Sequence, residues 1–316
     1  MAETFLIVYN LLFFWKVYSN PFSMARSELL STFFPSWIHL GRNLRERKPL
    51  SHDPYYWLNY HAHSVLSTYY PLHIGSAYVG SWLMLDKAFC ILTQVVFIHS
   101  LFASIGWYCL FSVYFNPQIA LFGAIVLTYS AYNIKQQPCT LYTIAWFPWL
   151  LLGIAQNNVL LAGISLGMVF LAGYYPIGLQ ITLIAIGAAM LWRAHLWFVP
   201  IGLVVGLPQI VPFIRYLPKT IRTNKISNIG KIPIWHLLSL VCPKLFRFNI
   251  NGVGYWETAY YVGIVPLVLL AITLLNQTSR VWILGVVSLM LMLGAFSRFL
   301  PRIPARWCFS FQFALG

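Results

Sequence analysis

Apolar runs long enough to cross a lipid bilayer recur along almost the whole of this 316-residue chain. A transmembrane helix needs about 20 consecutive, mostly apolar residues, and hydropathy together with run length predicts nine approximate spans. They cover residues 4–20, 89–115, 117–134, 140–156, 158–174, 176–193, 196–213, 258–275 and 281–297. Only 8% of the residues are charged, whereas soluble domains carry roughly 25%. The sequence therefore predicts an all-α protein with a single membrane domain over residues 1–316, a bundle of about nine transmembrane helices.

Two long polar loops interrupt the predicted spans: a first loop at residues 21–88, in which interfacial helices are expected, and a second at 214–257. An even number of predicted spans separates them, so both loops are expected on the same side of the membrane. The positive-inside rule favours the cytoplasmic side, because most of the chain's cations lie in these loops. The basic side chains either anchor the loops to lipid headgroups or line a vestibule that receives phosphate-bearing lipids.

Carboxylates are scarce in this chain, which has six acidic residues, none of them in the middle of an apolar span. This pattern weighs against a proton or cation relay, which places ionisable residues at mid-membrane depth. His99 lies near the middle of a predicted span and is interpreted as a packing or hydrogen-bonding residue. A catalytic carboxylate would have to be Glu28, Asp53, Asp86 or Glu257.

Four side chains of the first loop, His52, Asp53, His61 and His63, could bind a divalent metal, since imidazole and carboxylate suit such ions. Histidines two positions apart do not share one face of a helix, so hydrogen-bonded surface histidines are the alternative. We therefore predict no metal site and no cofactor, and keep a divalent metal as the open alternative. The sequence contains no phosphate-binding loop, dinucleotide fingerprint or nucleophile elbow. It also contains no nucleic-acid-binding module, and no nucleic-acid partner is expected.

Eight short segments follow one another in the order in which they occur in a known family. They are Glu28 to Pro35, Pro49 to Trp57, Tyr70-Pro71-Leu72, Ala145 to Trp149, Leu171 to Tyr175, Pro208 to Pro212, Glu257 to Gly263 and Ile303 to Arg306. By these segments the chain resembles the YfhO-type bacterial membrane proteins, a branch of the GT-C glycosyltransferases that take sugars from polyprenyl-phosphate donors. It departs from the family at Glu28, where an aspartate is usual. Because family members are usually much longer, we interpret the chain as the N-terminal part of a longer architecture.

The resemblance implies a GT-C-like bundle with a long interfacial first loop, in the bacterial cytoplasmic (inner) membrane. The implied activity is inverting transfer of a sugar from a polyprenyl-phosphate donor to an extracytoplasmic polymer or lipid. The partners would be membrane lipids, the polyprenyl-phosphate-linked sugar and the envelope polymer or lipid acceptor. The loops would then face outward, opposite to the side that the charge bias favours. The alternative is a lipid or polymer transporter, or a non-catalytic, truncated membrane subunit.

The resemblance also implies roles for individual residues. Glu28 is the first candidate for the base that takes the proton from the acceptor hydroxyl, and Asp53 is the second. Glu257 lies where the family carries an acid and is assigned to substrate binding; its alternative role is a salt bridge that tethers the second loop. Basic side chains can stabilise the charge that develops on a leaving lipid phosphate. The candidates for this role are Arg222, Lys225 and Arg306.

Overall fold

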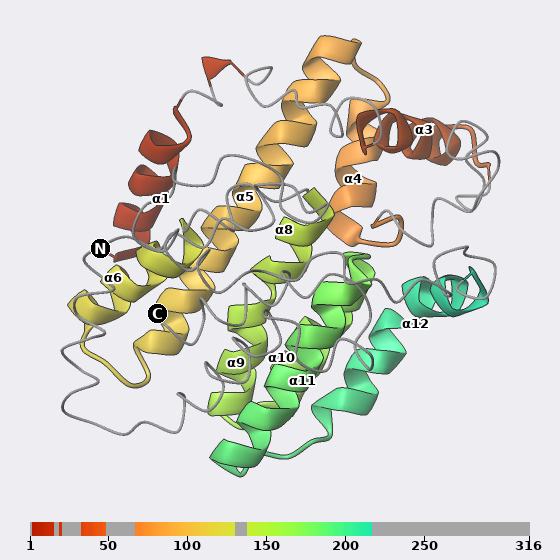
Figure 1. Ribbon diagram of the computed structural model, residues 1–316. Helices are drawn as coiled ribbons and strands as arrows, with labels where there is room; N and C mark the ends of the chain where they lie inside the picture. The colour runs from red at the N-terminus through yellow and green to blue at the C-terminus, as the bar shows by residue number, and fades with distance from the viewer. Residues whose placement is uncertain (1, 16–18, 21–32, 49–66, 130–137, 217–316) are drawn as a thin grey trace, which may run out of the picture. The chain divides into compact units, whose positions relative to one another are not determined.

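The computed structural model describes residues 2–15, 19–20, 33–48, 67–129 and 138–216. Within these ranges all regular secondary structure is helical (Figure 1), which confirms the predicted all-α class. Two of the described helices are long enough and apolar enough to cross a bilayer. They are α5 (Leu85–Phe111) and α12 (Phe198–Tyr216). Such helices are consistent with membrane association.

The remaining helices are shorter, and most of them coincide with a predicted span. Those that overlap predicted spans over most of their length are α1 (Ala2–Phe13), α6 (Pro117–Thr128), α8 (Pro138–Ala145), α9 (Phe147–Ala155), α10 (Val159–Leu171) and α11 (Tyr175–Trp192). Two further helices, α3 (Phe34–Arg45) and α4 (Pro71–Gly80), lie within the polar loop predicted at residues 21–88. The spans predicted at 258–275 and 281–297 lie outside the described residues.

The span predicted at 140–156 consists of two helices, α8 and α9, separated by a turn at Trp146. The physical reason is Pro148, which occupies the second position of α9. A proline has no N–H to donate, and its ring clashes with the carbonyl four residues earlier. The hydrophobic run is therefore continuous although the helix is not.

The chain divides into two compact units, and each is described here by itself. The first unit comprises residues 1–113 and 137–220, and the second comprises 114–136 and 221–316. In the second unit the structure describes residues 114–129, which include α6. The side chain of Asn116 caps α6 by accepting a hydrogen bond from the backbone N–H of Ile119 at 3.0 Å, a common way to satisfy a free N–H at a helix start.

In the first unit, α3 packs against α4 through one buried tryptophan and two glycines. The Trp37 side chain is fully buried, and its indole N–H donates to Ser76 Oγ at 3.2 Å. The six-membered part of its ring lies over Gly80, where a Cβ would collide with it, and Gly41 lies against the backbone of Ala77. These close approaches hold α3 alongside α4, as Figure 1 shows.

Helices α10 and α12 pack closely along their length because each presents small residues to the other. Gly163 and Gly167, four residues apart on α10, face α12, and Gly202 and Gly206 on α12 face α10. A Cβ on Gly202 would lie 2.6 Å from Cγ of Leu166, which is closer than real Cβ contacts allow. Small residues at this spacing let two helix backbones approach, which is the usual device for helix pairing in membranes.

Candidate functional site

A cluster of polar side chains lies halfway along α5, where an apolar environment would be expected. The helix has 27 residues, and at about 1.5 Å per residue it is roughly 40 Å long, close to the thickness of a bilayer with its headgroups. His99 lies near its middle and contacts Tyr70, which precedes α4. Ala77 of α4 packs with Ala88 and Leu92, near the start of α5. Helix α4 therefore runs back along the first half of α5, and its own start lies at mid-length of α5.

The cluster contains a chain of hydrogen bonds with one consistent direction. The Nδ1 atom of His99 lies 2.6 Å from the carbonyl oxygen of Val95, which can only accept. A neutral His99 therefore carries its proton on Nδ1 and accepts at Nε2. The Tyr70 hydroxyl, 2.7 Å from Nε2, donates to it and accepts from the indole N–H of Trp146 at 2.8 Å. When His99 is neutral, each donor and acceptor in this series of hydrogen bonds has a partner.

Stacked aromatic rings surround the hydrogen-bonded chain. The ring of Tyr142 on α8 lies 5.3 Å from that of Tyr70 and 4.3 Å from that of His99, measured between centroids. His73 meets the ring of Tyr142 edge-on, with the ring centroids 5.9 Å apart. His73 is buried, and its Nδ1 atom has no hydrogen-bond partner among the described residues. The cluster thus combines two buried imidazoles and two stacked phenols from α4, α5 and α8.

A second group of contacts fixes the backbone just before Tyr70. The Oε1 atom of Gln209, a buried residue of α12, lies 3.4 Å from the backbone N–H of Tyr69. The Tyr175 hydroxyl donates to the backbone carbonyl of the same glutamine. Ser67 Oγ donates to the carbonyl of Ala172, in the turn between α10 and α11. Residues 67–70 are therefore held by the turn at one end of α11 and by α12.

The turn between α10 and α11 depends on a glycine in the left-handed region. Gly173 has a φ of +82°, a conformation that side-chain-bearing residues rarely adopt. A Cβ at this position would also lie 2.6 Å from the backbone nitrogen of Ser67. The glycine therefore serves both the turn and the close approach of the segment that leads to Tyr70.

Four of the segments that carry the family resemblance meet at this place. Tyr70-Pro71-Leu72 contributes the central hydroxyl, Ala145 to Trp149 contributes the indole, Leu171 to Tyr175 contributes the glycine turn, and Pro208 to Pro212 contributes Gln209. Hydrogen bonds join Tyr70 to Trp146 and Tyr175 to Gln209 directly. The two pairs are linked through Ser67 and Tyr69, which lie just before Tyr70 in the chain. We refer to Tyr70, His73, His99, Tyr142, Trp146 and Gln209 as the central polar cluster.

None of the six residues to which a catalytic or substrate-binding role was assigned lies within the described residues. Those predictions were Glu28, Asp53, Arg222, Lys225, Glu257 and Arg306. The acids that the structure does describe are Glu3, Glu46 and Asp86, and all three are exposed. The central polar cluster therefore has no described carboxylate, and the contacts that its side chains make are hydrogen bonds and ring contacts that orient chain segments.

Sequence reasoning anticipated only one member of the central polar cluster, His99, whose predicted hydrogen-bonding role is confirmed. Tyr70 and Trp146 stood in the quoted segments but were given no role. Gln209 carried a usable signal, because an uncharged amide between two prolines in an apolar run needs a hydrogen-bond partner. His73 carried no such signal, since its burial depends on how α4 packs.

The hydroxyl of Tyr70 can be tested by replacing it with phenylalanine. Tyr70→Phe should lower the free energy of unfolding by about 1 to 3 kcal/mol, because the Trp146 N–H and the Nε2 atom of His99 would be left buried without this partner. Thermal unfolding of the purified protein in detergent measures the effect. Tyr78→Phe is the matched control, because Tyr78 lies on α4, the helix that Tyr70 precedes, and is exposed. Equal unfolding temperatures for the two variants would show that the hydrogen-bonded chain does not stabilise the fold.

No group of three or more His, Cys, Asp or Glu side chains that could hold a metal ion occurs in the part of the chain that the structure describes. The first-loop residues considered for a metal, His52, Asp53, His61 and His63, lie outside it. No protein-family model, curated protein or solved structure matches this chain. The assignment of a function therefore rests on the central polar cluster and its contacts.

Proposed function

We propose that this chain is the membrane portion of a GT-C-like glycosyltransferase that moves a sugar from a polyprenyl-phosphate donor to an extracytoplasmic polymer or lipid. The observation that supports it is that three resemblance segments contribute to the central polar cluster and a fourth, Leu171 to Tyr175, contacts it through Gln209. Short aromatic and proline motifs are common in membrane helices, and unrelated ones would have no reason to contact one another. Their direct contacts favour a shared origin with the family.

The proposed reaction is a single displacement at the anomeric carbon. The oxygen of the acceptor hydroxyl forms a bond to that carbon while the bond from the carbon to the phosphate oxygen breaks, which inverts the configuration. A carboxylate takes the hydroxyl proton, and Glu28 is the first candidate for it, with Asp53 second. The polyprenyl phosphate leaves with the bonding electron pair, and its negative charge is stabilised by cations. The candidates are Arg222, Lys225 and Arg306, with Glu257 assigned to substrate binding.

In this proposal the central polar cluster positions the first loop and takes no part in the chemistry. Residues 67–70 are fixed by Gln209 and by the turn at Gly173, and Asp53 lies 14 residues before Ser67 in the sequence. A rigid attachment at this end limits where the candidate carboxylate can lie. Precise positioning is worth a large part of an enzyme's rate enhancement.

The first test of the proposal is to determine on which side of the membrane the two loops lie. Single cysteines near Glu46 and near Asn228, on a cysteine-free background, should react with an impermeant maleimide in intact cells. A cysteine at position 194, in the turn between α11 and α12, is the control and should stay protected until the membrane is opened. The reverse pattern would place the loops in the cytoplasm, contradict the proposal and favour a transporter or a non-catalytic subunit.

Donor turnover tests the chemistry directly. The full chain, reconstituted in liposomes, would be supplied with undecaprenyl phosphate carrying radiolabelled glucose, mannose or galactose, together with a cell-envelope extract as acceptor. The proposal predicts that at least one of these donors transfers its label to the extract and releases polyprenyl phosphate. Liposomes without protein give the background. Absence of turnover with all donors, in protein that is folded and correctly oriented, would contradict it.

A further inference from the structure

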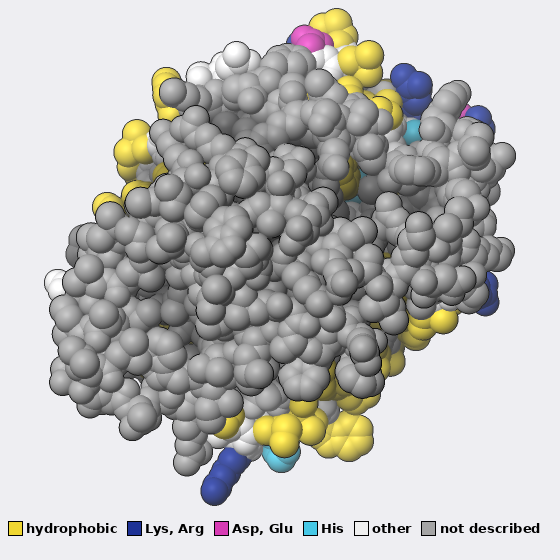
Figure 2. Space-filling model, viewed as in Figure 1, with side chains coloured by type: hydrophobic (Ala, Val, Ile, Leu, Met, Phe, Trp, Pro, Cys, Tyr) yellow, Lys and Arg dark blue, Asp and Glu magenta, His cyan; other side chains and the backbone are white. Residues whose placement is uncertain are grey.

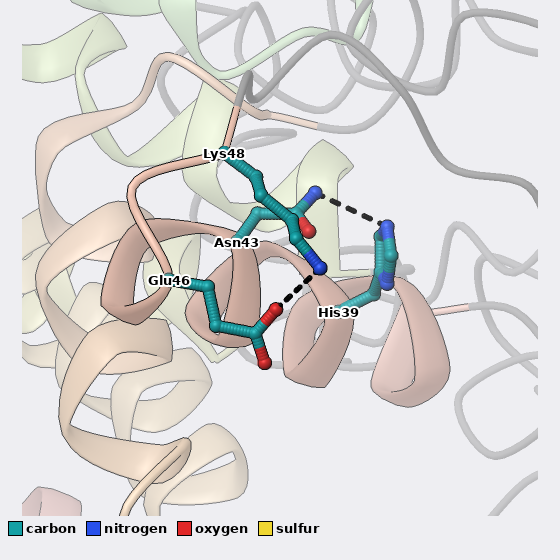
Figure 3. Close-up of polar contacts among 4 residues, drawn as sticks. All are labelled: His39, Asn43, Glu46 and Lys48. Carbon is teal, nitrogen blue, oxygen red and sulfur yellow. Dashed lines mark hydrogen bonds and ion pairs between the residues drawn. The ribbon is translucent and has the colours of Figure 1, made fainter.

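The exposed side of α3 is basic at its C-terminal end. Arg42 and Arg45 lie in its last turn, and Arg47 follows directly; all three side chains are exposed. Glu46 lies among them, but Lys48 forms an ion pair with it at 2.6 Å (Figure 3). The hydrogen bond and charge of Lys48 lower the pKa of the Glu46 carboxyl. The acid is thus neutralised by its neighbour, and the three arginines keep their excess positive charge.

The turn between α4 and α5 places apolar side chains next to one of these cations, Arg45. Trp82 and Met84 are 62% and 63% exposed, and Leu85 is exposed as well. Arg45 connects the two elements, because its guanidinium donates to the carbonyl of Ser81 at 2.8 Å and lies 5.2 Å from the ring centroid of Trp82. Figure 2 shows Lys and Arg side chains beside exposed apolar ones along the upper right edge, in the region of α3 and the start of α5.

The position of this surface along α5 determines what it can meet. Helix α5 starts at Leu85 and is long enough and apolar enough to cross a membrane. The start of a spanning helix lies at the level of the lipid headgroups, where tryptophan and arginine are favoured. Arg45 is bonded to Ser81, just before that start. Arg45 is therefore placed at headgroup depth beside Trp82. Arg42 and Arg47 lie within three residues of it in the sequence and are exposed as it is.

We propose that Arg42, Arg45, Arg47, Trp82 and Met84 form a lipid-anchoring surface that binds the phosphate groups of anionic phospholipids. Charge complementarity identifies the occupant, since guanidinium groups pair with phosphate oxygens and clustered cations beside a span are attracted to anionic lipids. The anchor would hold α3 flat on the membrane and set the depth at which α5 begins. This inference does not depend on the proposed transferase activity.

Native mass spectrometry tests this surface. Phosphatidylglycerol or phosphatidylcholine is added to the full chain in detergent, and the binding of each lipid is measured. The wild-type protein should bind phosphatidylglycerol more tightly, and raising the salt concentration should reduce that preference because the attraction is electrostatic. The double substitution Arg42→Gln with Arg47→Asn should weaken phosphatidylglycerol binding by about tenfold, since each cation near an anionic lipid contributes several-fold. Arg45 is left in place because it also bonds to the α4–α5 turn.

Arg193→Asn is the matched control. Arg193 and Arg47 both have a φ of 55°, and asparagine tolerates this left-handed region, so both substitutions remove one charge at similar backbone cost. Arg193→Asn should change phosphatidylglycerol binding by less than about threefold, because no described lysine or arginine lies near it in sequence. Equal affinity of the wild-type protein for the two lipids would overturn the proposal, even if the double variant failed to fold. Displacement of phosphatidylglycerol by equimolar undecaprenyl phosphate would also overturn it, since the surface would then be a donor site.

Discussion

Replacing Glu28 with glutamine should lower the rate of sugar transfer by about 10²- to 10⁴-fold, the range expected for loss of a general base. Glutamine has nearly the size of glutamate but cannot take a proton from the acceptor hydroxyl. The variant should therefore insert and fold as the wild-type protein does. The measurement is the transfer of label from the donor that the wild-type chain turns over.

Glu46→Gln is the matched control for this experiment. It also removes a carboxylate from the first loop, but Glu46 is exposed and paired with Lys48 (Figure 3). Its transfer rate should stay within about twofold of wild type, as expected for an exposed ion pair. If Glu28→Gln keeps full activity and Asp53→Asn loses it, the base is Asp53. Full activity of both variants would contradict the proposed mechanism, and a transporter would tolerate both changes.

Replacing Gly167 with leucine should lower the free energy of unfolding by more than about 3 kcal/mol, at or above the upper end of the usual cost of overpacking. A Cβ on Gly167 would collide with the Val205 side chain and would lie 3.3 Å from the carbonyl oxygen of Gly202. The obstacle on α12 thus includes backbone, which cannot rotate away as a side chain can. The two helices would have to separate along their interface.

Gly187→Leu on α11 is the matched control, because no described atom lies within 4 Å of the position of its added Cβ. Thermal unfolding in detergent, followed by the fraction of protein that stays monodisperse, should show a loss of roughly 5 to 10 °C for Gly167→Leu and little change for Gly187→Leu. Similar losses for both variants would show that the close approach of α10 and α12 does not stabilise the bundle.

The positions of the helices were largely predictable from the sequence. Each of the predicted spans at 4–20, 89–115, 117–134, 158–174, 176–193 and 196–213 contains most of one described helix. Run length and hydropathy suffice because a helix satisfies its backbone hydrogen bonds locally, whatever it packs against. The exception is the break at Trp146 between α8 and α9, for which Pro148 was a visible but unused signal.

The central polar cluster was only partly predictable. His99 was expected to form hydrogen bonds because a polar residue in the middle of an apolar run needs a partner, and it has two. Which partners it has depends on tertiary packing, since Tyr70 is 29 residues away in the chain. The amide of Gln209 contacts a backbone 140 residues away. No periodicity connects such positions.

The sequence by itself determined the class of this protein, because composition, run length and the scarcity of charge decide whether a chain forms apolar helices. It also contained the glycines at Gly163, Gly167, Gly202 and Gly206. Only the tertiary structure decided that these two pairs face each other and that the end of the first loop is fixed at mid-length of α5. Helix formation is governed by local contacts, whereas the choice of packing partner depends on the match of two surfaces that are distant in the chain.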